Sequence, residues 1–345
     1  MKKQLRALVS ALALVVAPAV AGAQSLSYNS GQNVAPGYEG WEEAPDGTKY
    51  FLFGYMNRNW EEEPDVAVGV GNGFAPGAID QGQPTHFLPR RNRFVFRVKV
   101  PATFTAKDEL VWTITTNGVT EKAYASLRDD YKVDDVVKAS ETGALGAGTS
   151  SPEIRANKPP IVKVDGPKML TAKVGQSVAI VAAVTDDGVP KRRGLGLSGG
   201  AVNNGPRPGG AAGAAPAAPA GASATAAAPA TPAPDVPVAF RNLATLPPTR
   251  VTVGKNVGLH LSWFVYRSPA DAAVTFDPIQ IKAWEDTRAG ANSPWAPIWA
   301  QPEMPADGKI TVRIAFSQPG TYVLRGLADD GALTGSDDVT VTVTK

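Results

Sequence analysis

Apolar and polar residues alternate with a period of two along much of the chain, and this alternation predicts β-strands rather than helices. Four such runs lie in the first half of the chain, at 49–56, 93–100, 109–116 and 119–127. The last two flank Asn117-Gly118, and Asn-Gly between two alternating runs is a strong signal for a β-hairpin. Residues 24–142 are therefore expected to form one all-β domain.

A second set of apolar runs follows a break in the pattern. The break, residues 143–158, is rich in Gly, Ser and Ala and precedes a pair of prolines, which is typical of a linker. The later runs lie at 161–166, 169–175, 177–185, 257–267, 309–316, 320–328 and 337–344. They predict a second all-β domain over residues 159–344.

This second domain is interrupted by a segment of low complexity. Between Gly194 and Pro234, 31 of 41 residues are Ala, Gly or Pro, so the segment cannot bury a core. We expect a disordered Ala/Pro/Gly-rich insert over residues 189–250, grown from a surface loop between two strands.

Two stretches of the second domain carry a family resemblance, VGQSVAIVAAVTDDG (174–188) and PGTYVLRGLADDGALTGSDDVTVTV (319–343). They resemble the polycystic-kidney-disease (PKD) type and related immunoglobulin-like modules of bacterial exported proteins. The whole chain also resembles exported bacterial proteins of uncharacterised function. The resemblance implies a fold class that is all-β, with two immunoglobulin-like β-sandwich domains.

The first residues are typical of a secretory signal peptide. Lys2, Lys3 and Arg6 precede an apolar stretch that ends in the small residues 21–23, so we expect cleavage after Ala23. Loss of these three cations takes the formal net charge from +2 to −1. The expected location of the mature chain is periplasmic or extracellular, and no run long enough to span a membrane is predicted after the signal.

The composition excludes several functions. The chain has no Cys and only two His residues, which excludes thiol catalysis and disfavours a zinc site. A nearly neutral mature chain gives no electrostatic reason to expect nucleic acid as a partner. No cofactor is predicted, with calcium as the one exception.

The calcium hypothesis comes from two similar stretches, VTDDG (184–188) and LADDG (327–331), each after an apolar run. In an immunoglobulin-like sandwich they would close strands B and F, which lie in opposite sheets and end at one pole. Four carboxylates would then meet, those of Asp186, Asp187, Asp329 and Asp330. They could bind calcium, or they could be solvated turn residues, since Asp-Gly favours tight turns.

Carboxylates also gather between residues 42 and 65, close to Trp41 and Trp60. They are Glu42, Glu43, Glu61, Glu62, Glu63 and Asp65. Paired carboxylates beside aromatic rings suit glycoside hydrolysis, and the alternative is an acidic surface loop. The G-x-S-x-G match around Ser198 lacks the strand and helix that a nucleophile elbow needs, so we interpret it as chance.

The strand at 93–100 predicts two different faces. Phe94, Phe96 and Val98 are expected on the core side, whereas Arg91, Arg93, Arg97 and Lys99 are expected on the other. Such a cationic face could hold an anionic ligand, but we expect it to meet acidic partners on neighbouring strands, such as Glu121.

Three tryptophans occupy a Pro-rich stretch between strands, at Trp284, Trp295 and Trp299. Exposed Trp rings stack on sugars or anchor protein partners, and long ordered loops are common binding elements. The rings could instead cover an open edge of the sandwich.

The sequence favours an exported binding or scaffold protein of the cell envelope with no chemistry of its own, and with a protein or a polysaccharide as partner. The Trp stretch is the expected ligand-binding surface. Two alternatives stay open, a carbohydrate-active enzyme that uses the carboxylates between 42 and 65, and a calcium-stabilised structural spacer.

Overall fold

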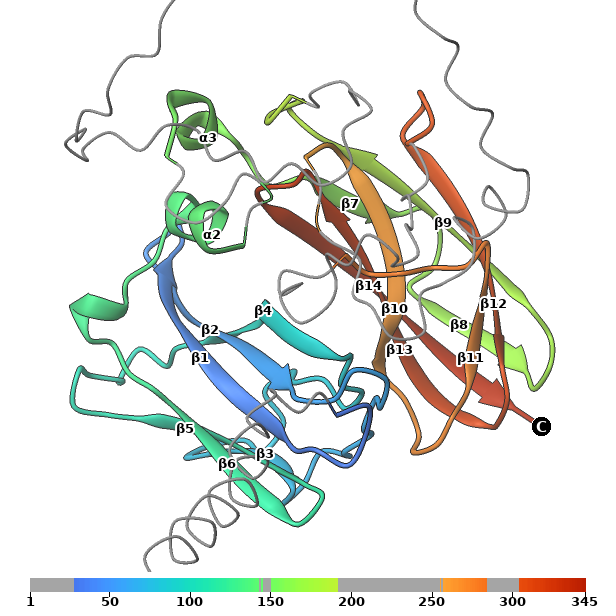
Figure 1. Ribbon diagram of the computed structural model, residues 1–345, viewed down its shortest axis with the longest axis horizontal. Coiled ribbons are helices and arrows are strands. Elements are labelled where there is room, and N and C mark those ends of the chain that lie inside the picture. The colour runs from blue at the N-terminus through green and yellow to red at the C-terminus, as the bar shows by residue number, and fades with distance from the viewer. Residues whose placement is uncertain (1–27, 143, 145–149, 192–254, 256, 284–303) are drawn as a thin grey trace, which may run out of the picture.

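The computed structural model describes residues 28–142, 144, 150–191, 255, 257–283 and 304–345, which form two β-sandwiches, two short α-helices and the 3₁₀ helix η2 (Asp129–Tyr131) (Figure 1). The predicted signal peptide, most of the predicted insert and all three Trp residues of the Pro-rich stretch lie outside these residues. In the described part of the chain, no helix is long and apolar enough to cross a membrane.

The N-terminal sandwich has two three-stranded antiparallel sheets. One contains β1 (Val34–Glu43), β2 (Lys49–Asn57) and β4 (Arg90–Lys99), and the other contains β3 (Asn72–Ala75), β5 (Leu110–Thr116) and β6 (Val119–Ala125). The β5–β6 hairpin turns at Asn117 and Gly118, whose φ angles of 48° and 76° are those of a type I′ turn. The predicted hairpin is therefore confirmed.

Aromatic rings fill the space between these two sheets. Phe53 on β2 packs on Phe74, Phe96 and Trp112, with ring centroids 5.1, 5.5 and 5.8 Å away. Trp112 is fully buried, and its indole Nε1 donates to Asn72 Oδ1 at 2.9 Å. The polar end of the ring thus finds a partner inside an otherwise apolar core.

The C-terminal sandwich has two four-stranded sheets. In spatial order they are β7 (Ile161–Val164), β9 (Val178–Thr185), β12 (Lys309–Phe316) and β11 (Val274–Asp277), facing β8 (Met169–Lys173), β14 (Thr334–Thr344), β13 (Gly320–Asp329) and β10 (His260–Arg267). All pairs are antiparallel except that of β8 with β14. The first sheet corresponds to strands A, B, E and D of an immunoglobulin fold, and β10, β13 and β14 correspond to C, F and G.

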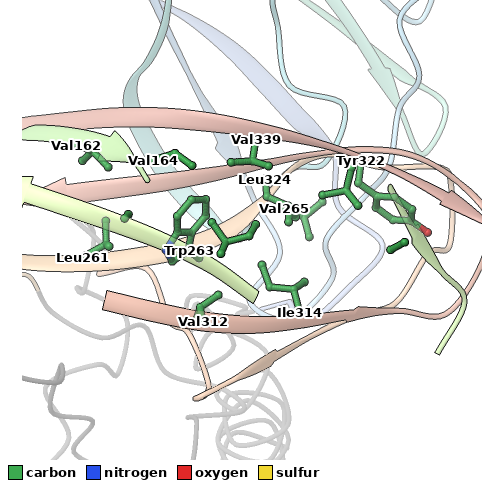
Figure 2. Packing of buried hydrophobic residues seen from close by; sticks show 14 of the residues in the cluster. Val162, Val164, Leu261, Trp263, Val265, Val312, Ile314, Tyr322, Leu324 and Val339 are labelled. Atoms are coloured by element: carbon green, nitrogen blue, oxygen red, sulfur yellow. The ribbon is translucent and has the colours of Figure 1, made fainter. Parts of the chain in front are cut away.

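Two buried side chains mark this sandwich as immunoglobulin-like (Figure 2). Trp263 lies on β10, the position of the buried Trp of strand C. Tyr322 lies near the start of β13, and its hydroxyl donates to Gln318 O at 2.8 Å, which is a tyrosine corner. Leu324 stands two residues after this tyrosine, where disulfide-bonded domains carry a cysteine, so packing replaces the covalent link.

Removal of the tyrosine corner is expected to cost about 1 kcal/mol of unfolding free energy, the net value of one hydrogen bond. The test is Tyr322→Phe, which leaves the Gln318 carbonyl oxygen without this donor, followed by urea unfolding. The matched control is Tyr124→Phe on β6, whose side chain is exposed and is expected to tolerate the change. Equal stability of the two variants would contradict a structural role for the Tyr322 hydroxyl.

The structure contains elements that the alternation did not predict. Strands β1, β3 and β11 are additional, and α2 (Asp135–Thr142) ends a domain that was expected to be all-β. The stretch predicted as a linker, 143–158, contains the helix α3 (Pro152–Ala156). Pro152 starts this helix, Ser151 caps it by accepting from Ile154 N, and Ile154 is buried against Ala139, Ala332 and Leu333. The short helices thereby connect the two sandwiches at one end (Figure 1).

Candidate functional site

The two sandwiches meet through backbone and side-chain hydrogen bonds. Tyr266 O accepts from Thr85 N at 3.1 Å and from His86 N at 3.4 Å, while its hydroxyl donates to Gly82 O at 2.6 Å. Arg267 binds Asp80 through two bonds of 2.9 and 2.7 Å. The end of β10 is thus fixed against the loop that precedes β4.

Arg325 is the central cation of this interface. Its guanidinium binds Asp338 at 2.7 and 2.8 Å and donates to Val95 O of the N-terminal sandwich at 2.6 Å. The same group lies over the ring of Tyr266, 3.7 Å from its centroid. Burial alone would lower the pKa of Arg325, but Tyr266 and Asp338 outweigh it and raise the pKa above the ordinary value.

His86 forms a second contact between the sandwiches. Its Nδ1 lies 2.9 Å from Asp65, its Nε2 lies 2.9 Å from Glu63, and the hydroxyl of Ser268 donates to the same Asp65 oxygen at 2.8 Å. Burial alone would lower the pKa of His86, but the two carboxylates outweigh it and raise the pKa to about 9. At neutral pH the ring is an imidazolium that donates to both acids.

Between the sandwiches lies a cleft of about 900 Å³, which we call the interdomain cleft. Its walls are formed by residues of β2, β4, β10, β13, β14 and α2. The N-terminal wall contributes Leu52, Phe94, Val95 and Arg97, and the C-terminal wall contributes Phe264, Val323, Arg325 and Leu327. The cleft thus combines apolar surface with charged side chains from both domains.

Phe94 reaches the cleft through an irregularity in β4. The register of β2 and β4 shifts here, because Phe53 pairs with Phe96 whereas Tyr55 pairs with Asn92. Phe94 has a φ of 49°, a left-handed conformation that costs a bulky residue roughly 1–3 kcal/mol. The prediction that Phe94 joins Phe96 and Val98 in the core is therefore wrong, since the bulge turns its ring into the cleft.

Three arginines of β4 have acidic partners, as the sequence predicts, but the partners differ. Arg97 lies 3.4 Å from Glu42, Arg91 lies 2.5 Å from Glu39, and Arg93 pairs with Glu141. Glu121, the partner that we expected, instead lies 3.8 Å from Arg58. The new partners come from β1 and α2, which the alternation did not predict.

The two Asp-Asp-Gly stretches close β9 and β13, which belong to opposite sheets, so they are two turns of one domain. Lys158 N donates to Asp187 at 3.1 Å and Asn157 Nδ2 donates to Asp330 at 3.0 Å, which places both turns beside the same dipeptide. Asp330 also accepts from Ala332 N and Leu333 N, and burial raises its pKa to about 6.

The remaining acidic groups of this pole also have partners within the chain. Asp329 forms a buried ion pair of 2.9 Å with Lys255. Asp186 accepts from Gly188 N at 2.9 Å within its own turn. Among the residues that the structure describes, no group of three or more His, Cys, Asp or Glu side chains could hold a metal ion.

Calcium at this pole stays a prediction, and it has a simple test. A cation that binds only the native state raises the melting temperature, because binding adds to the free energy of unfolding. The expected result for a calcium site at Asp186, Asp187, Asp329 and Asp330 is a higher melting temperature in calcium than in chelator. Identical melting curves would contradict the calcium hypothesis, and Asp186→Asn with Asp187→Asn would abolish a genuine shift.

The carboxylates between 42 and 65 are engaged at separate places. Glu42 pairs with Lys138 of α2, and Glu43 lies 3.0 Å from Lys132. Glu62 accepts from Gly31 N at 2.5 Å. The imidazole of His86 occupies the space between Glu63 and Asp65, where a glycosidase would need room for the sugar or a water molecule. These contacts stabilise the fold and give no observation in favour of hydrolysis.

Other sequence candidates lie outside the described residues, namely Ser198 and the expected ligand-binding residues Trp284, Trp295 and Trp299. The described chain reaches Ala283 and resumes at Met304. Sequence reasoning missed the interdomain cleft and the contacts of His86. The cleft depends on residues from different domains, and His86 meets Asp65 and Glu63 from 21 and 23 positions away, so no local pattern signals either feature.

Comparison with known proteins adds little to this description. No family model matches the chain, and no curated protein matches it. Solved structures that align with it include the Yersinia pseudotuberculosis adhesin InvE (10% identity, TM-score 0.22, 92% of this chain and 61% of that one). A chimeric titin Z1Z2 aligns at 10% identity and TM-score 0.21 (91% and 99% of the two chains), and domains 4 and 5 of the S-layer protein SbsC align at 9% and 0.19 (91% and 98%). Such TM-scores are too low to support any statement about function.

Proposed function

We propose that the protein is an exported binding or scaffold protein of the cell envelope that catalyses no reaction, with a protein or a glycan as its ligand. The observation that carries this proposal is the pairing of the charged groups in the interdomain cleft. Arg325 pairs with Asp338, Arg267 with Asp80 and Lys138 with Glu42. A general acid or base works best when its pKa lies near the operating pH, and an opposite charge at close range moves a pKa away from that value by favouring the charged form.

The linkage between the sandwiches supports the same role. Contacts from Arg267, Ser268 and Arg325 reach three different parts of the N-terminal domain, so the two domains form one preorganised surface. Preorganisation favours binding because less conformational freedom is lost when the ligand arrives. We also propose that the C-terminal sandwich is a PKD-type module, in keeping with its strand order and its Tyr322 corner.

Export by the predicted signal peptide is part of this proposal. An exported protein meets components of the cell envelope, so the ligand is sought there. The mature chain, residues 24–345, would be immobilised and exposed to solubilised cell envelope, and the eluate analysed for protein and for sugar. The expected result is a specific protein or glycan that is lost with Trp295→Ala plus Trp299→Ala, or with Phe94→Gly in the cleft.

Both variants must first give cooperative melting curves, so that loss of fold is not mistaken for loss of binding. An eluate identical to that from an unrelated β-sandwich would contradict a binding function. Turnover of an envelope component by the purified chain would contradict the absence of catalysis.

A further inference from the structure

We propose that the interdomain cleft binds a neutral oligosaccharide, an inference that rests on the binding function proposed above. The cleft volume of about 900 Å³ lies within the usual range of ligand sites, roughly 300–1,000 Å³. Residues of both domains line it, so the site exists only when the two sandwiches are docked.

The charge pattern of the cleft favours a ligand without net charge. Five of the cations along its walls have carboxylate partners, in the pairs Arg93–Glu141, Arg97–Glu42, Lys138–Asp135, Arg267–Asp80 and Arg325–Asp338. Arg325 is only 11% exposed and Lys138 only 20%, so an ionised ligand that separated either cation from its carboxylate would leave a charge without its partner largely out of bulk water, which is costly. Hydroxyl groups both donate and accept, so they can add hydrogen bonds to a carboxylate or a guanidinium without separating the pair.

Aromatic rings in the cleft are the second feature that favours a sugar as the ligand. Phe94 belongs to the N-terminal wall and Phe264 to the C-terminal wall, and both rings are half-buried. The faces of such rings pack against the C–H faces of sugars, while the charged groups beside them bind the hydroxyls. The left-handed backbone of Phe94 holds its ring at the cleft in place of the core position that the strand pattern predicts. Strained conformations of this kind are concentrated at ligand sites.

The available backbone groups argue against an extended peptide as the ligand. Peptides often bind by adding a strand to a free sheet edge, and the edge strands that reach the cleft are β4 and β10. Val95 O on β4 already accepts from Arg325, and Trp263 N on β10 already donates to Gln280 Oε1 at 3.1 Å. Tyr266 O accepts from Thr85 N and His86 N. These contacts occupy part of both edges, which favours recognition by side chains, and side-chain recognition suits a polyol.

The test uses the mature chain and saturation-transfer NMR. The probes are neutral trisaccharides built from glucose, mannose, galactose or N-acetylglucosamine, with trigalacturonic acid as the charged comparison. Magnetisation transfer to at least one neutral trisaccharide, and weaker transfer to the acid, is the expected result. Absence of transfer to every neutral probe, or preference for the acid, would overturn the proposal.

Substitutions in the cleft test whether the trisaccharide that receives magnetisation binds there. Phe94→Gly suits the left-handed backbone and is expected to fold, and it removes the ring, so affinity should fall at least tenfold. Phe264→Ala on the opposite wall is expected to act in the same direction. The matched control is Tyr124→Ala, an exposed ring on β6 outside the cleft, which should bind as the parent does. Unchanged affinity in both Phe variants, with folding verified, would overturn the proposal.

The outcome separates this proposal from the function on which it rests. If envelope capture yields a protein partner while no neutral trisaccharide binds, the binding function stands and the sugar site falls. If a trisaccharide binds in the cleft and is also cleaved, the site stands and the absence of catalysis is contradicted.

Discussion

Replacement of Arg325 by Met is expected to lower the free energy of unfolding by about 3 kcal/mol, the lower end of the range for breaking a buried ion pair. Arg325 makes three kinds of contact at once, with Asp338, with the ring of Tyr266 and with Val95 O across the interface. Met preserves much of the side-chain volume but none of these hydrogen bonds. Asp338 is more exposed than Arg325, so water compensates part of the loss.

Urea unfolding of the mature chain measures this effect. The matched control is Arg313→Met, an exposed arginine on β12 of the same sandwich, where a change below about 0.5 kcal/mol is expected. Because Arg325 also joins the domains, the variant should unfold over a broader urea range than the parent does. A destabilisation within 0.5 kcal/mol of the control would contradict the central role of Arg325 in the interface.

Local sequence signals predicted the elements whose structure is itself local. Asn117 and Gly118 both have positive φ. A type I′ turn requires positive φ at its two central residues, and Asn-Gly is the dipeptide that meets this requirement most readily. The two Asp-Asp-Gly turns follow apolar runs, and their assignment to strands B and F is confirmed by the positions of β9 and β13. These predictions needed only a few neighbouring residues and the sheet order of a known architecture.

Local sequence signals did not predict elements whose sequences are irregular. β1 contains Pro36, Gly37 and Gly40, and its register with β2 shifts between Tyr38 and Gly40, so no clean alternation marks it. The helix α3 lies in a segment whose Gly and Ser content is typical of a linker. Burial of Ile154 against Ala139, Ala332 and Leu333 stabilises this helix. Tertiary contacts determine the secondary structure of both segments, and the intrinsic propensity of a single segment gives no information about such contacts.

The candidate site was harder still to predict, because its members are far apart in the sequence. His86 meets Glu63 and Asp65 from a neighbouring loop, and it meets Ser268 only through Asp65 and the docking of the second domain. The alternation at 93–100 predicted Phe94 in the core, because a β-bulge leaves no signal in the pattern of apolar and polar residues. Chemistry between domains becomes apparent only when both domains are placed.

The imidazolium of His86 is expected to make the stability of the fold depend on pH. Its pKa of about 9 in the folded chain exceeds the ordinary value of 6.5, so the folded state binds the proton more tightly than the unfolded state does. Below about pH 6.5 the stabilisation is complete, and it is lost as the pH rises through about 9. The difference between the two values corresponds to roughly 3 kcal/mol, and His86 is only 11% exposed, so solvent screening removes little of it.

The measurement is the free energy of unfolding of the parent and of His86→Gln between pH 6 and pH 10, compared at each pH. The stability advantage of the parent should shrink by roughly 3 kcal/mol over this range. Asp330, with its pKa of about 6, titrates in both proteins alike, so its contribution cancels when they are compared at each pH. The matched control is His260→Gln, which changes the other histidine of the chain and leaves the contacts of His86 with Glu63 and Asp65 in place. An advantage that stays constant with pH would mean that the ring between Glu63 and Asp65 is neutral. In that case Ser268 and Asp65 would hold the two domains together without help from a charged histidine.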